Sequence, residues 1–182
     1  CLFVVAPMSG GNVKKYHMKK LFLLLLVGFI GLQLTAQESA LPKVMIKTLE
    51  GQSFSTSDIS NDGKPVILSF WALWCKPCQK ELDAFNELYA EWQKETGVKI
   101  YAVSIDDSRS TARVAPLVKG KSWEFEVLLD PNGDFKRAMN VNMIPHTFLI
   151  DGNGKIVSQH TAYFDGAEHE LYEKVKKLVG KK

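Results

Sequence analysis

The chain has 182 residues, of which 46% are hydrophobic and 24% charged, with a formal net charge of +3 at pH 7. This length and apolar content are typical of one globular domain with a buried core, not of a disordered chain. Residues 1–37 hold four lysines and no acidic residue, so the rest of the chain has a net charge of −1 and shows no basic stripe with interleaved aromatic residues. Nucleic acid is therefore not an expected partner.

The N-terminal segment has the pattern of a secretory signal peptide. A charged start at Met18-Lys19-Lys20 precedes the apolar run 21–34 and a short stretch of small and polar residues. The run is shorter than the roughly 20 residues that span a bilayer, which favours cleavage, with an uncleaved signal anchor as the alternative. We expect 1–37 to comprise upstream residues and a cleaved signal peptide, with Met18 or Met8 as the true start, and 38–182 to form the mature domain. Export would place that domain in a compartment where disulfides persist.

The predicted elements begin with a hairpin and then alternate between strands and helices. Alternating stretches around a glycine turn predict the hairpin, continuous apolar runs predict buried strands, and apolar residues at three- and four-residue spacing predict helices. The expected strands are residues 43–49, 53–55, 66–71, 98–105, 125–129, 147–150 and 156–160. The expected helices are one from the Cys-x-x-Cys pair at 75–78 to about 96, and three over 109–118, 133–140 and 167–179. Gly97 is expected to end the first helix and Pro116 to kink or split the second. A strand, a helix and a strand within about 40 residues imply a right-handed parallel crossover, so the sheet is α/β in character.

Two cysteines lie at the junction between strand 66–71 and the first long helix. The first turn of a helix has unpaired N–H groups and the positive end of the helix dipole, and both stabilise a thiolate. Such a position can lower a thiol pKa from roughly 8.5 by one unit or several. Cys75 is therefore the predicted nucleophile, and Cys78, one turn further on the same face, is close enough to attack the mixed disulfide that Cys75 would form.

The alternative to a redox-active pair is that the two cysteines form half of a structural zinc site. Zinc normally needs two further Cys or His ligands at short spacing. The remaining cysteine is Cys1, which falls in the segment expected to be removed, and the four histidines are scattered at positions 17, 146, 160 and 169. The pair is therefore predicted to be redox-active, with no metal and no cofactor other than its own disulfide.

Three motifs carry a resemblance to a known family. WCKPC at residues 74–78 resembles the W-C-x-P-C active site of thioredoxin-fold proteins, and MIPHTFLID at 143–151 resembles their cis-proline segment. Together with LLDPNG at 128–133, they make residues 40–178 similar to the extracytoplasmic TlpA/ResA-like thiol:disulfide oxidoreductases of the thioredoxin superfamily. The resemblance implies an α/β thioredoxin fold with an N-terminal β-hairpin and a central insertion, formed by the helix and strand predicted between 109 and 129.

The resemblance also implies a substrate-binding surface. Pro145 would be cis and would pack against the active-site disulfide, leaving the backbone of the preceding residue free to pair with a bound substrate strand. The apolar side chain of Ile144 would border the nucleophile and withhold hydrogen bonds from its thiolate. Trp74, together with Trp71, would shield the disulfide and offer a flat apolar contact surface, unless the two are ordinary core aromatics.

Glu81 is the third candidate catalytic residue. It follows Cys78 by three residues on the same helical face, and in ResA-like proteins a glutamate at this offset is associated with tuning the cysteine pair, here as a proton acceptor. The alternative is that an acid in the first turn only favours the helix dipole. Ser69 stands where thioredoxin has a buried aspartate used in proton transfer. Because that aspartate is absent here, Glu81 becomes the candidate for the proton-transfer role.

The implied function is an exported oxidoreductase that reduces disulfides of other proteins in the cell envelope. Lys76-Pro77 between the cysteines and Ile144 before the proline resemble the reducing members, which are recharged by a membrane thiol donor. We expect a periplasmic monomer, soluble or signal-anchored. Apocytochrome c, a mispaired secreted protein and a specific envelope enzyme are all open as substrates.

Two other classes compete with this function. A copper-delivering protein of thioredoxin fold could use Cys75, Cys78 and His146 as soft and borderline ligands, although the cysteines of such proteins are usually spaced by three residues. A peroxiredoxin has its peroxidatic cysteine in a T-x-x-C context, and Ala72 occupies the position of that threonine.

Overall fold

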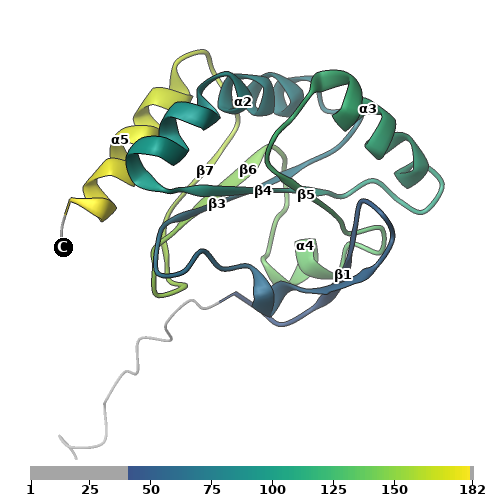
Figure 1. Cartoon of the computed structure of the whole chain (residues 1–182). Helices are drawn as coiled ribbons and strands as arrows, with labels where there is room; N and C mark the ends of the chain where they lie inside the picture. Colours follow the sequence, from purple (N-terminus) through teal and green to yellow (C-terminus); the bar gives the residue numbers. More distant parts are fainter. Residues whose placement is uncertain (1–40, 181–182) are drawn as a thin grey trace, which may run out of the picture. The chain divides into compact units, whose positions relative to one another are not determined.

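Residues 41–180 are described by a computed structural model, and the expected signal segment lies outside them (Figure 1). The strands are β1 Met45–Thr48, β2 Ser53–Ser55, β3 Val66–Trp71, β4 Lys99–Ser104, β5 Glu126–Leu129, β6 His146–Ile150 and β7 Ile156–Thr161. The α-helices are α2 Lys76–Thr96, α3 Val114–Lys121, α4 Asp134–Ala138 and α5 Ala167–Val179, with 3₁₀ turns η1 Thr56–Asp58 and η2 Thr111–Arg113. No helix in this part of the chain combines the length and the apolar character that crossing a membrane requires.

The seven strands form one mixed sheet in the order β2-β1-β5-β4-β3-β6-β7. The central strands β3, β4 and β5 are parallel, as the predicted crossover requires, whereas β6, β7 and the β1–β2 hairpin are joined by antiparallel pairing. The α3–β5 unit inserts β5 between β4 and β1. The predicted fold, with its hairpin and its helix–strand insertion, is therefore confirmed.

The sheet separates two hydrophobic cores. Figure 1 shows α2, α3 and α5 over one face and α4 beneath the other. Because side chains alternate between the faces of a strand, Ile67 and Trp71 of β3 pack under α2, whereas Leu68 and Phe70 pack with Phe135 of α4. A strand that is buried on both faces reads as a continuous apolar run, and β3 is buried at all its positions.

The segment after β4 differs from the prediction of one helix over 109–118. Asp107 Oδ1 accepts hydrogen bonds from the backbone N–H groups of Arg109 and Ser110, and these bonds form a turn before the helix. The chain then forms η2, and α3 begins only at Val114. Pro116 therefore lies in the first turn of α3, where its missing N–H has no intrahelical acceptor. The expected single helix is split, but the division falls between η2 and α3 at Val114 and not at Pro116.

A close backbone approach at the end of the sheet opposite the cysteines predicts a stability effect. A Cβ added to Gly152 would lie 2.1 Å from the carbonyl oxygen of Gly63. We expect Gly152→Ala to lower the free energy of unfolding by about 1–3 kcal/mol through this clash, measured by urea denaturation. Gly120→Ala is the matched control, since Gly120 is helical and a Cβ there meets nothing within 4 Å. An equal effect of both substitutions would contradict the clash.

Candidate active site

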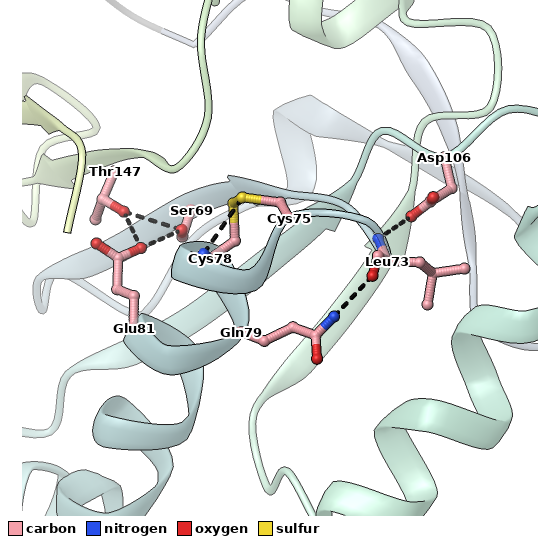
Figure 2. The surroundings of a disulfide bond; sticks show 8 residues. All are labelled: Ser69, Leu73, Cys75, Cys78, Gln79, Glu81, Asp106 and Thr147. Carbon is pink, nitrogen blue, oxygen red and sulfur yellow. Dashed lines mark hydrogen bonds between the residues drawn. A yellow bond between two sulfur atoms is a disulfide. The ribbon is translucent and has the colours of Figure 1, made fainter.

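Cys75 and Cys78 form a disulfide at the N-terminus of α2 (Figure 2). Cys75 is the N-cap residue, and its Sγ accepts a hydrogen bond from the backbone N–H of Cys78 at 3.3 Å. Pro77 lies in the first turn, where it is tolerated. Cys75 keeps 5% of its surface exposed and Cys78 keeps none, so a partner reaches Cys75 first. The predicted position of the pair is confirmed, and the burial favours Cys75 as the nucleophile.

Two buried polar side chains hold the loop that leads to Cys75. The backbone N–H of Leu73 donates to Asp106 Oδ2 at 2.9 Å, and its carbonyl accepts from Gln79 Nε2 at 2.8 Å (Figure 2). Ser104 Oγ also donates to Asp106 Oδ2, at 2.8 Å, which fixes that carboxylate at the end of β4. The loop is thus held between β4 and α2. Sequence reasoning missed Asp106 and Gln79; the one available signal was an acid just after a buried strand.

Glu81 lies one helical turn beyond Cys78 and is fully buried. Its Oε2 accepts hydrogen bonds from Ser69 Oγ at 3.0 Å and Thr147 Oγ1 at 2.9 Å, and its Oε1 lies 2.9 Å from Nε2 of His160. The two hydroxyls donate to the carboxylate, and Nε2 of His160 donates or accepts according to the tautomer of the ring. The first turn of α2 contains no acidic residue, so the alternative that Glu81 serves only the helix dipole is wrong.

The predicted cis proline is present, because the Ile144–Pro145 peptide bond is cis. Pro145 is buried directly before β6, and Ile144 packs against the core cluster that contains both cysteines. The first residues of β6 pair with the last residues of β3, so this segment lies at the same end of the sheet as the disulfide. The structure therefore brings Ile144 and Pro145 to the cysteines, as expected.

The two tryptophans near the disulfide have different environments. Trp71 is fully buried, with its ring edge-to-face against Trp123 at a centroid distance of 5.0 Å. Trp74 is 70% exposed. Trp71 is therefore a core aromatic, and Trp74 alone offers the expected contact surface. Met143 and Phe164, which the sequence did not single out, are also exposed at this end of the sheet.

The loop that carries Phe164 is fixed by Glu168 at the start of α5. Glu168 Oε2 accepts hydrogen bonds from the hydroxyl of Tyr163 at 3.0 Å and from the backbone N–H of Gly166 at 3.1 Å. Burial, followed by the hydrogen bond to Glu168, raises the pKa of Tyr163 to about 12. Tyr163 therefore stays protonated as a donor at neutral pH and keeps the loop in place beside Pro145, whose carbonyl accepts from Ala162 N–H at 3.2 Å.

His146 does not join the cysteines. On β6 it alternates with Thr147, which faces α2, so its own side chain lies on the opposite face of the sheet. There the ring stacks on Phe148 at 4.3 Å and Nε2 lies 3.1 Å from Gln159 Oε1. Among residues 41–180, no three His, Cys, Asp or Glu side chains are grouped to hold a metal ion. The copper site of Cys75, Cys78 and His146 has no support in this geometry.

The chain is similar in sequence and structure to several known proteins. The sequence model described as the AhpC/TSA family matches residues 38–159. The thiol-disulfide oxidoreductase ResA of Bacillus thuringiensis subsp. konkukian is 35% identical over 138 residues, which are 76% of each chain. A thioredoxin-like protein from Porphyromonas gingivalis is 56% identical, with a TM-score of 0.70 over 77% of this chain and 92% of its own. StoA from Bacillus subtilis is 28% identical, with a TM-score of 0.58 over 73% of this chain and 97% of its own.

Proposed function

Because the chain belongs to the AhpC/TSA family and, within it, to the ResA-like thiol-disulfide oxidoreductases, we propose that it is an exported reductase of protein disulfides in the cell envelope. The observation that carries the proposal is the Cys75–Cys78 disulfide at the N-terminus of α2, with Cys75 the more accessible sulfur. In the cycle, the Cys75 thiolate attacks a partner disulfide and releases one partner thiolate. Cys78 then loses its proton and attacks Cys75, which releases the second partner thiolate and forms the Cys75–Cys78 disulfide.

Each residue of the site has a part in this cycle. Glu81, one turn after Cys78, accepts the proton that Cys78 loses. Ile144 presents an apolar side chain toward the cysteine cluster and offers the thiolate no hydrogen bond. Trp74, Ile144 and Pro145 contact the partner, with Met143 and Phe164 extending the apolar rim.

The residues around the cysteines support the reducing direction. Lys76-Pro77 between the cysteines and Ile144 before the cis proline resemble the reducing members of the family. The two electrons that leave in each cycle are returned by a membrane thiol donor, so the protein needs no bound cofactor. It acts as a monomer in the periplasm, delivered by the signal segment in residues 1–37. Its substrate is a protein disulfide, with apocytochrome c, a mispaired secreted protein and a specific envelope enzyme as candidates.

An equilibrium redox titration tests the direction of the reaction. The purified protein is incubated in glutathione or dithiothreitol buffers, its thiols are alkylated, and mass spectrometry of the peptides separates Cys75 and Cys78 from Cys1. We expect a potential of about −270 mV or somewhat above, whereas a value near about −120 mV would identify an oxidant. If the pair does not cycle but binds copper or zinc stoichiometrically, the oxidoreductase function is excluded.

A further inference from the structure

The proton that Glu81 takes from Cys78 needs an exit, because the Glu81 side chain is fully buried. The hydroxyls of Ser69 and Thr147 donate to Oε2, and a neutral hydroxyl does not hold an additional proton near neutral pH. The other carboxylate oxygen, Oε1, faces Nε2 of His160 at 2.9 Å. Of the three hydrogen-bond partners of Glu81, His160 is therefore the one that can take up a proton.

His160 connects the buried carboxylate to the surface. It lies on the edge strand β7, directly opposite Thr147 of β6, and 25% of its side chain is exposed. His160 is one of the residues that line a small pocket of about 70 Å³ between β7 and α5, together with Glu170 and Lys174. The charged groups near His160 are thus Glu81 of α2, which contacts Nε2, and Glu170 and Lys174 of α5, which line the same pocket, while Thr147 of β6 is uncharged.

The chemistry of imidazole suits this position. A histidine can accept a proton on one ring nitrogen and release a proton from the other, and its charge changes near physiological pH. The contact between Oε1 and Nε2 is satisfied in two ways: the carboxylate accepts from Nε2–H, or the carboxylic acid donates to an unprotonated Nε2. A proton can therefore cross the contact without any movement of heavy atoms.

We propose that His160 carries the proton of Cys78 from Glu81 to solvent; this inference rests on the proposed dithiol–disulfide cycle. Cys78 gives its proton to Glu81, and its sulfur attacks Cys75, so that the bond between Cys75 and the partner breaks and the partner leaves as a thiolate. In the Nδ1–H tautomer of His160, Nε2 carries no proton, so Glu81 passes the proton from Oε1 to Nε2 and His160 releases its Nδ1 proton to water. Exchange of the ring proton with solvent restores the Nδ1–H tautomer before the next cycle. The complete cycle starts from the Cys75 thiolate, the Cys78 thiol and one partner disulfide. It yields the Cys75–Cys78 disulfide, two partner thiolates and one proton.

A two-step thiol assay isolates the step that the relay serves. Reduced full-length protein in a Cys1→Ser background is mixed with 4,4′-dithiodipyridine; the first thiopyridone released reports attack by Cys75, and the second reports resolution by Cys78. His160→Gln retains an N–H donor for Glu81 Oε1 but cannot carry a proton. We expect this variant to slow the second release about tenfold or more and to leave the first unchanged, because general acid–base groups contribute at least this much.

Controls separate a proton relay from a structural role. His169→Gln changes an exposed histidine of α5, whose Nε2 lies 3.6 Å from Glu168 Oε1, and both releases should keep the parent rates. In His160→Ala, added imidazole should restore the second release, with stronger effect for more basic imidazoles. A parent-like second release in His160→Gln, or no restoration of His160→Ala by imidazole, would overturn the relay. Failure of the parent protein to release a second thiopyridone would instead overturn the proposed cycle.

Discussion

Cys75→Ser is expected to abolish the reduction of insulin disulfides completely, whereas Cys78→Ser is expected to accumulate mixed disulfides with partner proteins. A serine hydroxyl at position 75 cannot form the thiolate that the helix N-terminus stabilises, so no covalent intermediate arises. With Cys75 intact and Cys78 replaced, the first attack proceeds but nothing resolves its product. The greater exposure of Cys75 gives this asymmetry a structural basis.

The two variants are compared by insulin turbidity with dithiothreitol as the electron source and by non-reducing electrophoresis with mass spectrometry of trapped partners. Glu87→Gln, which changes an exposed residue of the same helix, is the matched control and should leave both readouts unchanged. Equal and partial losses in Cys75→Ser and Cys78→Ser, with no trapped species, would indicate that the two cysteines only stabilise the fold.

Elements that carry a long and regular pattern could be predicted from the sequence. The bounds of β3 and α5 agree with the expected residues, because β3 is a continuous apolar run and α5 keeps its helical spacing throughout. Gly97 ends α2 in the left-handed conformation, as expected for a glycine after a helix. Residues 109–118 were predicted less well, because the Asp107 side chain binds backbone N–H groups that a helix start would otherwise use.

The cysteine pair and the cis proline could be found because each has a local motif. The partners of Glu81 could not, because their positions depend on sheet pairing: Thr147 lies 66 residues away in sequence and His160 79 residues away. Asp106 reaches Leu73 across 33 residues for the same reason. No spacing rule within one element connects such residues, so only the order and register of the strands bring them together.

Ser69 shows how a departure from a family pattern can be compensated in three dimensions. The sequence shows only that β3 lacks the aspartate of thioredoxin at this position. In the structure, Ser69 Oγ donates to the carboxylate of Glu81, so an acid from α2 lies beside the position where thioredoxin has its own. The buried carboxylate near the cysteines is therefore retained, but it comes from the helix instead of the strand.

Glu81→Gln tests whether this carboxylate takes part in proton transfer or only in folding. The amide oxygen can accept from Ser69 and Thr147 in place of Oε2, and the amide nitrogen can donate to an unprotonated Nε2 of His160. Since every hydrogen bond can be kept, we expect the free energy of unfolding to change by less than about 1 kcal/mol. Glu81→Leu should cost several times more, because it leaves three buried or half-buried donors without an acceptor.

The catalytic effect should be large where the stability effect is small. Without an ionisable acceptor beside Cys78, we expect Glu81→Gln to slow the release of the second thiopyridone about 100-fold, in the range usual for a general base, while the first release changes little. Glu87→Gln, which changes an exposed acid of the same helix, is the matched control. If Glu81→Gln unfolds easily yet resolves the mixed disulfide at the parent rate, the carboxylate is structural. If it folds normally and resolves slowly, the buried acid is kept for its proton chemistry, since an amide would serve the fold equally well.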